Sequence, residues 1–227
     1  MIAALLAVAL AQTAVDEGTF VVRQDTVEVA RESFRLIHGR LQRGGIGWTL
    51  ATTVRYDRAR PVIVLAPIVE ITTDTLPATL QYDVADPREP SRILGELGRG
   101  RFTVRIVSRT TERAREFPAN GRPVVLDDSV FALYTVVAWR AAAQPVTLTA
   151  IVPRGLRRDT VQVQEVDATG SGGGGGGGLP APPGALRHVT VTGGPNGVVH
   201  LWLDGAGHLL RVEIPARRLS AERIPSG

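Results

Sequence analysis

The chain has 227 residues, a net charge of +4 and 44% hydrophobic residues, so it is long enough to bury a core without disulfides or metals. It contains no cysteine, which excludes disulfides, thiolate nucleophiles and zinc sites with cysteine ligands. All 26 basic residues are arginine, which excludes Schiff-base lysines and the lysine of a phosphate-binding P-loop.

The basic residues do not form a nucleic-acid-binding pattern. Aromatic residues make up 5% of the chain, and no basic stripe with interleaved aromatic residues occurs, so nucleic acid is not an expected partner. Arginine suits bidentate contacts with phosphate or carboxylate, which leaves anionic partners open.

The N-terminal segment, residues 1–11, is a short apolar run that ends in Ala9-Leu10-Ala11. Such a run, followed by a small-x-small site, is typical of a signal peptide cleaved near Ala11. It is too short to span a bilayer, so no membrane span is expected. The basic residues that normally precede the run are missing, and a buried N-terminal element is the alternative. We expect a periplasmic or secreted protein.

Two strands are predicted next, at Gly18–Gln24 and Val27–His38, around a turn at Asp25. In the second strand the apolar positions change register between Val29 and Phe34. This change predicts a β-bulge that bends the sheet.

Further strands follow from alternation of apolar and polar residues, over 48–56, 61–72, 78–84, 102–106 and 110–117. Alternation on one side is typical of antiparallel strands with one buried face. Pro67 favours an edge or a bulge in its strand. Asp86–Gly100 contains prolines and glycines and is interpreted as a loop, with room for one helical turn.

The run Leu126–Arg140 is apolar on every side. Asp127, Asp128 or Ser129 could cap a helix start, since carboxylates there complement the helix dipole. The run therefore predicts one central helix at about 127–142, packed against the sheet. The β-branched residues Thr135–Val137 favour the alternative, a strand.

Strands resume over 146–152, 161–163, 186–192, 198–203, 209–214 and 219–224, the last one closing the sheet edge. A Gly/Pro-rich loop at 168–185 separates two groups of these strands. The piece after it is too small for a core of its own. We therefore expect residues 12–227 to form a single, mainly β domain, with a strongly bent antiparallel sheet shaped as a half-barrel or open barrel.

No catalytic, metal or cofactor site is indicated. A hairpin turning at Asp204–Gly207 places Leu203 opposite His208 and His200 opposite Arg211, so that His200 and His208 do not form a metal pair. No Gly-x-Ser-x-Gly motif occurs, and a Ser/His/acid site assembled from distant residues has no support. The arginines near residues 99–109, 154–158 and 217–218 are expected on a solvated face, or at a cavity rim where they could hold lipid phosphates.

A bent sheet must cover its concave face, and incomplete cover by the central helix would leave an apolar cavity for a lipid or hydrophobic small molecule. The candidate cavity residues are the large apolar and aromatic side chains expected on this face: Trp48, Leu50, Tyr82, Phe102, Phe131, Tyr134, Trp139 and Trp202.

Three passages carry a resemblance: Gly18–Arg35, Leu126–Tyr134 and Val199–Ile214. Together they resemble uncharacterised secreted bacterial proteins with a curved antiparallel sheet, similar in outline to periplasmic lipoprotein carriers and lipid-binding proteins. The resemblance implies a half-barrel fold and an envelope location, and it transfers no site residues.

Three functions are open from the sequence. The first is a non-catalytic envelope protein that binds a lipid or other hydrophobic ligand in its half-barrel. The second is a structural or interaction module of the envelope with no ligand, and the third a hydrolase whose site is not visible in sequence. A cavity larger than roughly 300 Å³ beside the central helix favours the first, and a solid interior argues against it. The sequence does not indicate an oligomeric state.

Overall fold

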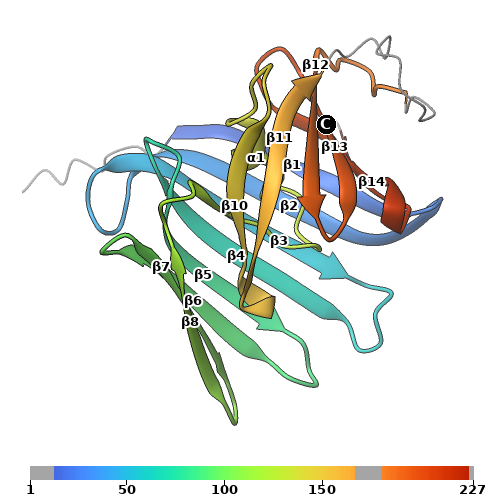
Figure 1. Ribbon diagram of the computed structural model, residues 1–227. Coiled ribbons are helices and arrows are strands. Elements are labelled where there is room, and N and C mark those ends of the chain that lie inside the picture. Colours follow the sequence, from blue (N-terminus) through green and yellow to red (C-terminus); the bar gives the residue numbers. More distant parts are fainter. Residues whose placement is uncertain (1–12, 167–179, 225–227) are drawn as a thin grey trace, which may run out of the picture.

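A computed structural model describes residues 13–166 and 180–224. The predicted signal peptide and most of the predicted Gly/Pro-rich loop lie outside these ranges. The described residues form one sheet of fifteen strands (Figure 1). Its first eight strands follow one another as neighbours: β1 (Thr13–Gln24), β2 (Val27–Arg40), β3 (Ile46–Tyr56), β4 (Ile63–Thr72), β5 (Pro77–Ala85), β6 (Ser91–Gly98), β7 (Arg101–Ser108) and β8 (Glu112–Pro118).

The second half of the chain returns to the first through its last strand. Its strands are also neighbours in chain order: β9 (Pro123–Val125), β10 (Val146–Val152), β11 (Arg157–Val166), β12 (Arg187–Gly194), β13 (Gly197–Leu203), β14 (Leu209–Ile214) and β15 (Leu219–Ile224). β15 pairs with β1. It therefore joins the two halves in the middle of the sheet, and the prediction that it closes an edge was wrong.

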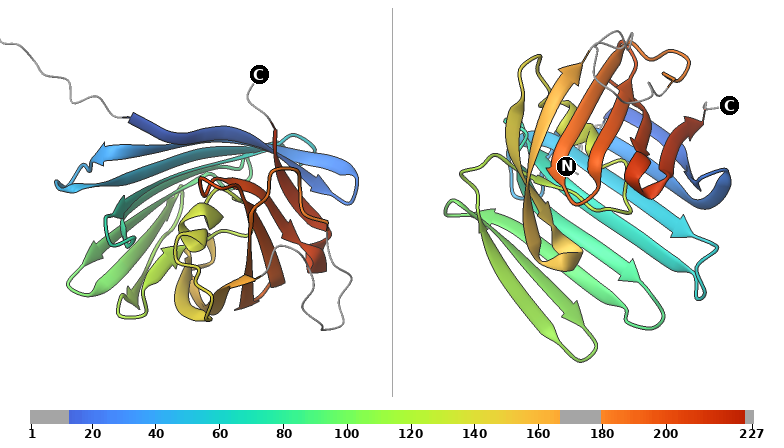
Figure 2. Two further views of the ribbon diagram at one scale, coloured as in Figure 1. Left: turned by 90° about the horizontal axis from the view of Figure 1, so that it is seen from above. Right: turned by 45° about the vertical axis from the view of Figure 1, so that its right-hand side comes forward.

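The sheet is bent but not closed into a barrel. All neighbours are antiparallel except β9 and β10, which run parallel, and β8 and β9 are the two edges. Figure 2 shows how the sheet curves around the segment that contains the helix. The predicted mainly β, strongly bent sheet is confirmed.

The predicted bulge lies at Val29. Val22 pairs with Ala30 and Arg23 pairs with Glu28, so Val29 is an extra residue in β2. Below the bulge, Phe20, Val22 and Phe34 point into the core. The change of apolar register in the sequence was therefore a reliable sign of this irregularity.

Two predictions in the first half were wrong. Asp86–Gly100 is not a loop, because β6 occupies most of it and pairs on both sides. Pro67 lies in a central strand rather than at an edge, and the pairing of β4 with β3 passes from Ile68 to Leu65 without it. This gap accommodates a residue that has no N–H to donate.

The central helix is much shorter than predicted. α1 covers Tyr134–Ala138, not 127–142. Residues 131–136 form tight turns in which the amides of Tyr134, Thr135 and Val136 each bond the carbonyl three residues earlier. After Ala138 the amides of Arg140 and Ala141 bond carbonyls three residues earlier, so the i→i−4 pattern of an α-helix does not continue. Two single-turn 3₁₀ helices, η1 (Pro153–Gly155) and η2 (Pro215–Arg217), connect strands elsewhere.

Candidate functional site

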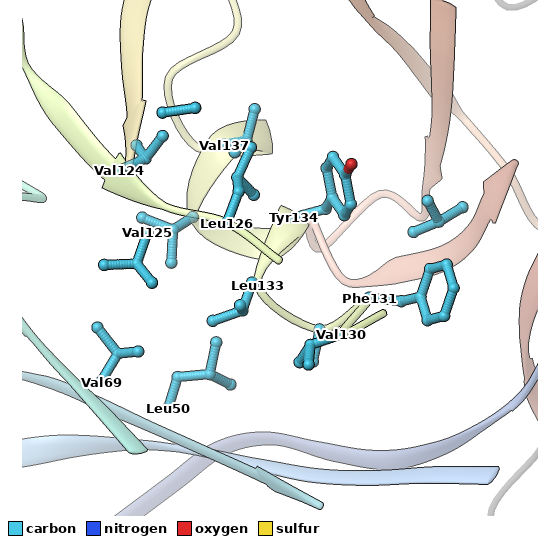
Figure 3. Close-up of a cluster of buried hydrophobic side chains, with 14 of the residues drawn as sticks. Leu50, Val69, Val124, Val125, Leu126, Val130, Phe131, Leu133, Tyr134 and Val137 are labelled. Atoms are coloured by element: carbon cyan, nitrogen blue, oxygen red, sulfur yellow. The ribbon is translucent and has the colours of Figure 1, made fainter. Parts of the chain in front are cut away.

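Residues 126–140, which we call the plug, fill the concave side of the sheet. Every residue from Val130 to Ala138 is buried. Figure 3 shows Leu133 facing Leu50 and Val69 of the sheet. Beside the plug, a cavity of about 30 Å³ remains next to Leu126 and Tyr134, which is about the volume of one water molecule. This cavity is too small for a hydrophobic ligand, and the described residues around the plug are packed as a core.

The buried carboxylate of Glu32 holds the start of the helical turns. Its two oxygens accept hydrogen bonds from the backbone amides of Phe131 (2.8 Å) and Ala132 (2.9 Å), and one also accepts from the Thr52 hydroxyl (2.8 Å). Burial raises the pKa of Glu32 to about 7, although these three hydrogen bonds act in the opposite direction. Glu32 therefore caps the helical turns: it accepts hydrogen bonds from their first free amides, although it lies in a strand about 100 residues away in the sequence.

Asp127 forms a second buried anchor. Its carboxylate, 1% exposed, accepts two hydrogen bonds from the Arg154 guanidinium (2.5 and 2.6 Å) and one from the Tyr82 hydroxyl (3.1 Å). Burial, reinforced by the negative charge of Asp127, raises the pKa of Tyr82 far above its ordinary value. A neighbouring tyrosine, Tyr56, donates to the Ser129 carbonyl at 2.9 Å. These contacts tie the plug to β3, β5 and η1.

Further arginines clamp the plug from outside. Arg157 contacts the Asp128 carboxylate at 3.2 Å, and Arg217 donates to the Asp128 carbonyl at 2.8 Å. At the other end, Arg140 donates to the carbonyls of Arg122 and Thr75, and burial lowers its pKa to about 10. Arg154, Arg157 and Arg217 thus bind plug groups, whereas the sequence suggested a solvated face or a phosphate-binding rim.

Seven of the eight predicted cavity residues meet in the core. Leu50, Tyr82, Phe102, Phe131 and Tyr134 belong to one buried cluster, and the half-buried Trp48 and Trp139 pack against it. The rings of Trp48 and Trp139 are 5.3 Å apart. Trp202 is buried but lies on the opposite face of the sheet, since it alternates with the core residues Leu201 and Leu203. The seven pack as core.

A hollow of about 830 Å³ lies on the sheet face that points away from the plug. Its floor is formed by two rows of residues that lie opposite one another across neighbouring strands: Ala51, Ile68, Gln81, Leu94, Arg105 and Ala114, and beside them Thr49, Glu70, Thr79, Glu96 and Thr103.

The β2–β3 hairpin borders this outer hollow. The backbone N–H of Gln42 and the Thr79 hydroxyl both donate to the buried Glu70 carboxylate (2.7 and 2.8 Å), and Arg43 contacts Glu96 at 2.6 Å. Hydroxyl, amide and charged groups therefore make up most of the floor, an arrangement suited to a polar partner. None of the predicted site residues lies in this hollow.

The histidines are arranged differently from the prediction. His200 lies opposite Glu213, and Leu203 opposite Leu209, because the β13–β14 pairing is irregular between Trp202 and Leu203. The histidines that meet are His188 and His200, and His208 contacts Asp204 at 3.0 Å.

Two arrangements that would indicate catalysis are absent from the described ranges. These ranges contain no hydrogen bond between a serine and a histidine, and no group of three or more His, Asp or Glu side chains placed to hold a metal ion. They also contain no helix with the length and apolar character needed to cross a bilayer.

Comparison with known proteins leaves the family open. No family model matches the sequence, and no curated protein matches it. The chain is similar to the crystal structure of a beta-barrel-like protein from Brucella abortus, described as a domain of unknown function. The sequences are 12% identical, the TM-score is 0.48, and the similarity covers 92% of this chain and 95% of the other.

Proposed function

We propose that the chain is a non-catalytic, exported protein of the bacterial cell envelope that acts as an interaction module. Its interior is a permanent core, and the outer hollow is its binding surface. The observation that carries this proposal is the solid interior: nine consecutive buried plug residues and a remaining cavity of about 30 Å³.

Carriage of a lipid inside the half-barrel is the competing function. It requires the plug to leave, because a hydrophobic ligand needs roughly 300 Å³ or more. Leaving would expose the side chains of Val130–Ala138, at about 1.5–3 kcal/mol for each large one. It would also leave Glu32 and Asp127 without their buried partners, which is costly for charged groups. The anchors at both plug ends therefore favour a scaffold over a lid.

The outer hollow offers what a polar partner needs. Threonine hydroxyls, the Gln42 and Gln81 amides, and charges of both signs line it. Such groups give directional hydrogen bonds, and complementary charge gives specificity more than raw affinity.

Native mass spectrometry of protein purified from the bacterial envelope tests the interior. We expect the mass of the free chain, and we expect the amides of residues 131–139 to exchange hydrogen only on global unfolding. A co-purifying lipid, together with faster exchange in this segment when lipid is removed, would establish a carrier and contradict the proposal.

Cysteine labelling tests the outer hollow, because the natural chain has no cysteine background. In Gln81→Cys the thiol lies on the hollow floor, and in the control Val198→Cys it lies on an exposed position of β13. We expect a cysteine-directed crosslinker to give one discrete adduct in envelope extracts from the first variant alone. Equal adducts from both variants would remove the hollow from the proposal.

A further inference from the structure

His188 and His200 form a pair on the outer face of β12 and β13. His188 lies opposite Trp202 and His200 opposite Thr190, so the two histidines are diagonal neighbours on adjacent strands. The Nε2 atom of His188 is 3.0 Å from the Nδ1 atom of His200. Both side chains are half-buried, which leaves one side of the pair open to solvent.

Aromatic stacking restrains the two rings. The Trp202 ring lies 4.9 Å from that of His188, nearly parallel to it, and 5.6 Å from that of His200. The Arg211 guanidinium lies over the same indole at 5.2 Å. Burial lowers the pKa of both histidines, and the proximity of His200 lowers that of His188 further. The stacking limits how far the rings can move, and the free nitrogen of a neutral imidazole can bind a metal.

We propose that His188 and His200 form a two-histidine binding site for a divalent transition-metal ion of right-angle coordination geometry, best represented by Cu²⁺. An ordinary metal–imidazole distance is about 2.1 Å. For two nitrogens 3.0 Å apart, this distance gives a nitrogen–metal–nitrogen angle of about 90°. Square-planar and octahedral ions require this angle, whereas a tetrahedral zinc site requires a wider one. Among such ions Cu²⁺ binds nitrogen ligands most tightly.

Binding needs a change of tautomer but no loss of protons. In the hydrogen-bonded pair, one of the two facing nitrogens carries a proton and donates the hydrogen bond, and the other accepts the hydrogen bond. With metal bound, the protons sit on Nδ1 of His188 and Nε2 of His200. One ring therefore moves its proton from the facing nitrogen to the far one. The two nitrogens face each other along the hydrogen bond in the free pair, so each ring must also turn to direct its lone pair at the ion.

The remaining coordination positions are available to oxygen ligands. Glu213 lies opposite His200 in the next strand and on the same face, where it pairs with Arg211 at 2.5 Å. Glu213 is held by Arg211, and the described residues contain no metal-binding group of three such side chains. Water molecules would therefore complete the coordination around the two histidines.

Cu²⁺ titration of the untagged chain at pH 7.5 tests this site. We expect one bound ion, an electron paramagnetic resonance spectrum with nitrogen hyperfine structure, and quenching of the stacked Trp202. His188→Ala and His200→Ala should each weaken binding by roughly tenfold or more. The matched controls His38→Ala and His208→Ala keep the pair and should bind as the natural chain does.

Two further variants keep the outcome clear. Trp202→Phe should bind Cu²⁺ but lose most of the fluorescence quenching. If His200→Ala unfolds, His200→Asn replaces it in the titration, because asparagine retains a hydrogen-bonding side chain. Binding that is unchanged in the His188 and His200 variants, or no spectrum with nitrogen ligands in the natural chain, would overturn the proposal. This test is independent of the outer hollow and of the plug.

Discussion

Glu32 is the residue on which the plug most depends. Its carboxyl group is fully buried and its pKa is raised to about 7 by burial, whereas an unfolded glutamate titrates near 4.5. Between these two values the folded chain binds a proton that the unfolded chain releases. The contribution of Glu32 to stability is therefore complete below pH 4.5 and is lost as the pH rises through 7.

Substitution Glu32→Gln tests this dependence. The change removes the titrating group, so the stability difference between natural chain and variant should decline from pH 4.5 to 7, by on the order of 3 kcal/mol. A further loss of about 1–3 kcal/mol that does not vary with pH is expected on top of this, since the NH₂ group of the variant would face amide donors. Urea unfolding across this pH range measures both effects.

Glu89→Gln is the matched control, because it makes the same charge change at an exposed residue before β6. If the free energy of unfolding of Glu32→Gln differs from that of the natural chain by the same amount at every pH, Glu32 does not titrate as inferred.

The sequence could indicate the plug but not its anchors. Leu126–Arg140 stood out as apolar on every side, and the acidic residues before it suggested a local cap. The actual partner of the first free amides is Glu32, an acidic residue in an otherwise regular strand pattern. Alternation places Glu32 on the same face as Ala30, Phe34 and Leu36, but only the tertiary fold shows that this part of the face lies beneath the plug.

At the scale of single elements, β6 shows how a glycine can obscure a strand. Gly95 weakened the alternation of Ile93 and Leu97, and the segment was interpreted as a loop. In the fold, a side chain at Gly95 would meet the Phe102 ring at 2.8 Å and the Leu80 Cβ at 2.9 Å. Glycine is therefore present for close packing rather than for a turn.

Two alanine substitutions in β6 test this explanation. Gly95→Ala should lower the free energy of unfolding by about 1–3 kcal/mol, as is usual for overpacked cores. Gly98→Ala, in the same strand, has no neighbour closer than 4.0 Å, and it should be neutral or stabilise by about 0.4–1 kcal/mol. Thermal unfolding compares the two. An equal loss of stability in the two variants would show that β6 does not tolerate alanine in general, and would contradict the explanation by close packing at Gly95.

At the scale of the whole molecule, the sequence predicted the fold class better than the topology. Alternation identified most strands and the bend at Val29, because both depend on local patterns. The pairing of β1 with β15 joins residues about 200 positions apart, and no local pattern indicates it. Trp202 was assigned to the wrong face for a different reason. Residues 201–203 are all apolar and buried, so the sequence does not show which face of this strand is the core. Trp202 is covered on the outer face by His188 and Arg211 of the neighbouring strands.

The open sheet leaves β8 as an exposed edge, which other chains could extend. Its sequence Glu112-Arg113-Ala114-Arg115-Glu116 reads the same in both directions. If two copies paired antiparallel about a two-fold axis, residues facing each other would come from the same sheet face. If the axis passes at Ala114, Arg113 faces Arg115 and Glu112 faces Glu116. If it passes at one of the arginines or glutamates, that residue faces its own copy. Each of these registers therefore pairs like charges, which is destabilising. The palindrome therefore protects the edge against pairing with itself.

Neutralising the arginines should remove this protection. We expect Arg113→Thr combined with Arg115→Thr to self-associate at concentrations where the natural chain does not, because threonine favours strands and removes the repulsion. Sedimentation velocity measures this. The control, Arg101→Thr with Arg105→Thr, makes the same charge change in β7, which has neighbours on both sides. Arg115 also donates to the Leu156 carbonyl at 2.9 Å, so thermal unfolding of both variants must show that the fold is kept. Self-association of the control to the same extent would attribute the effect to net charge rather than to the edge.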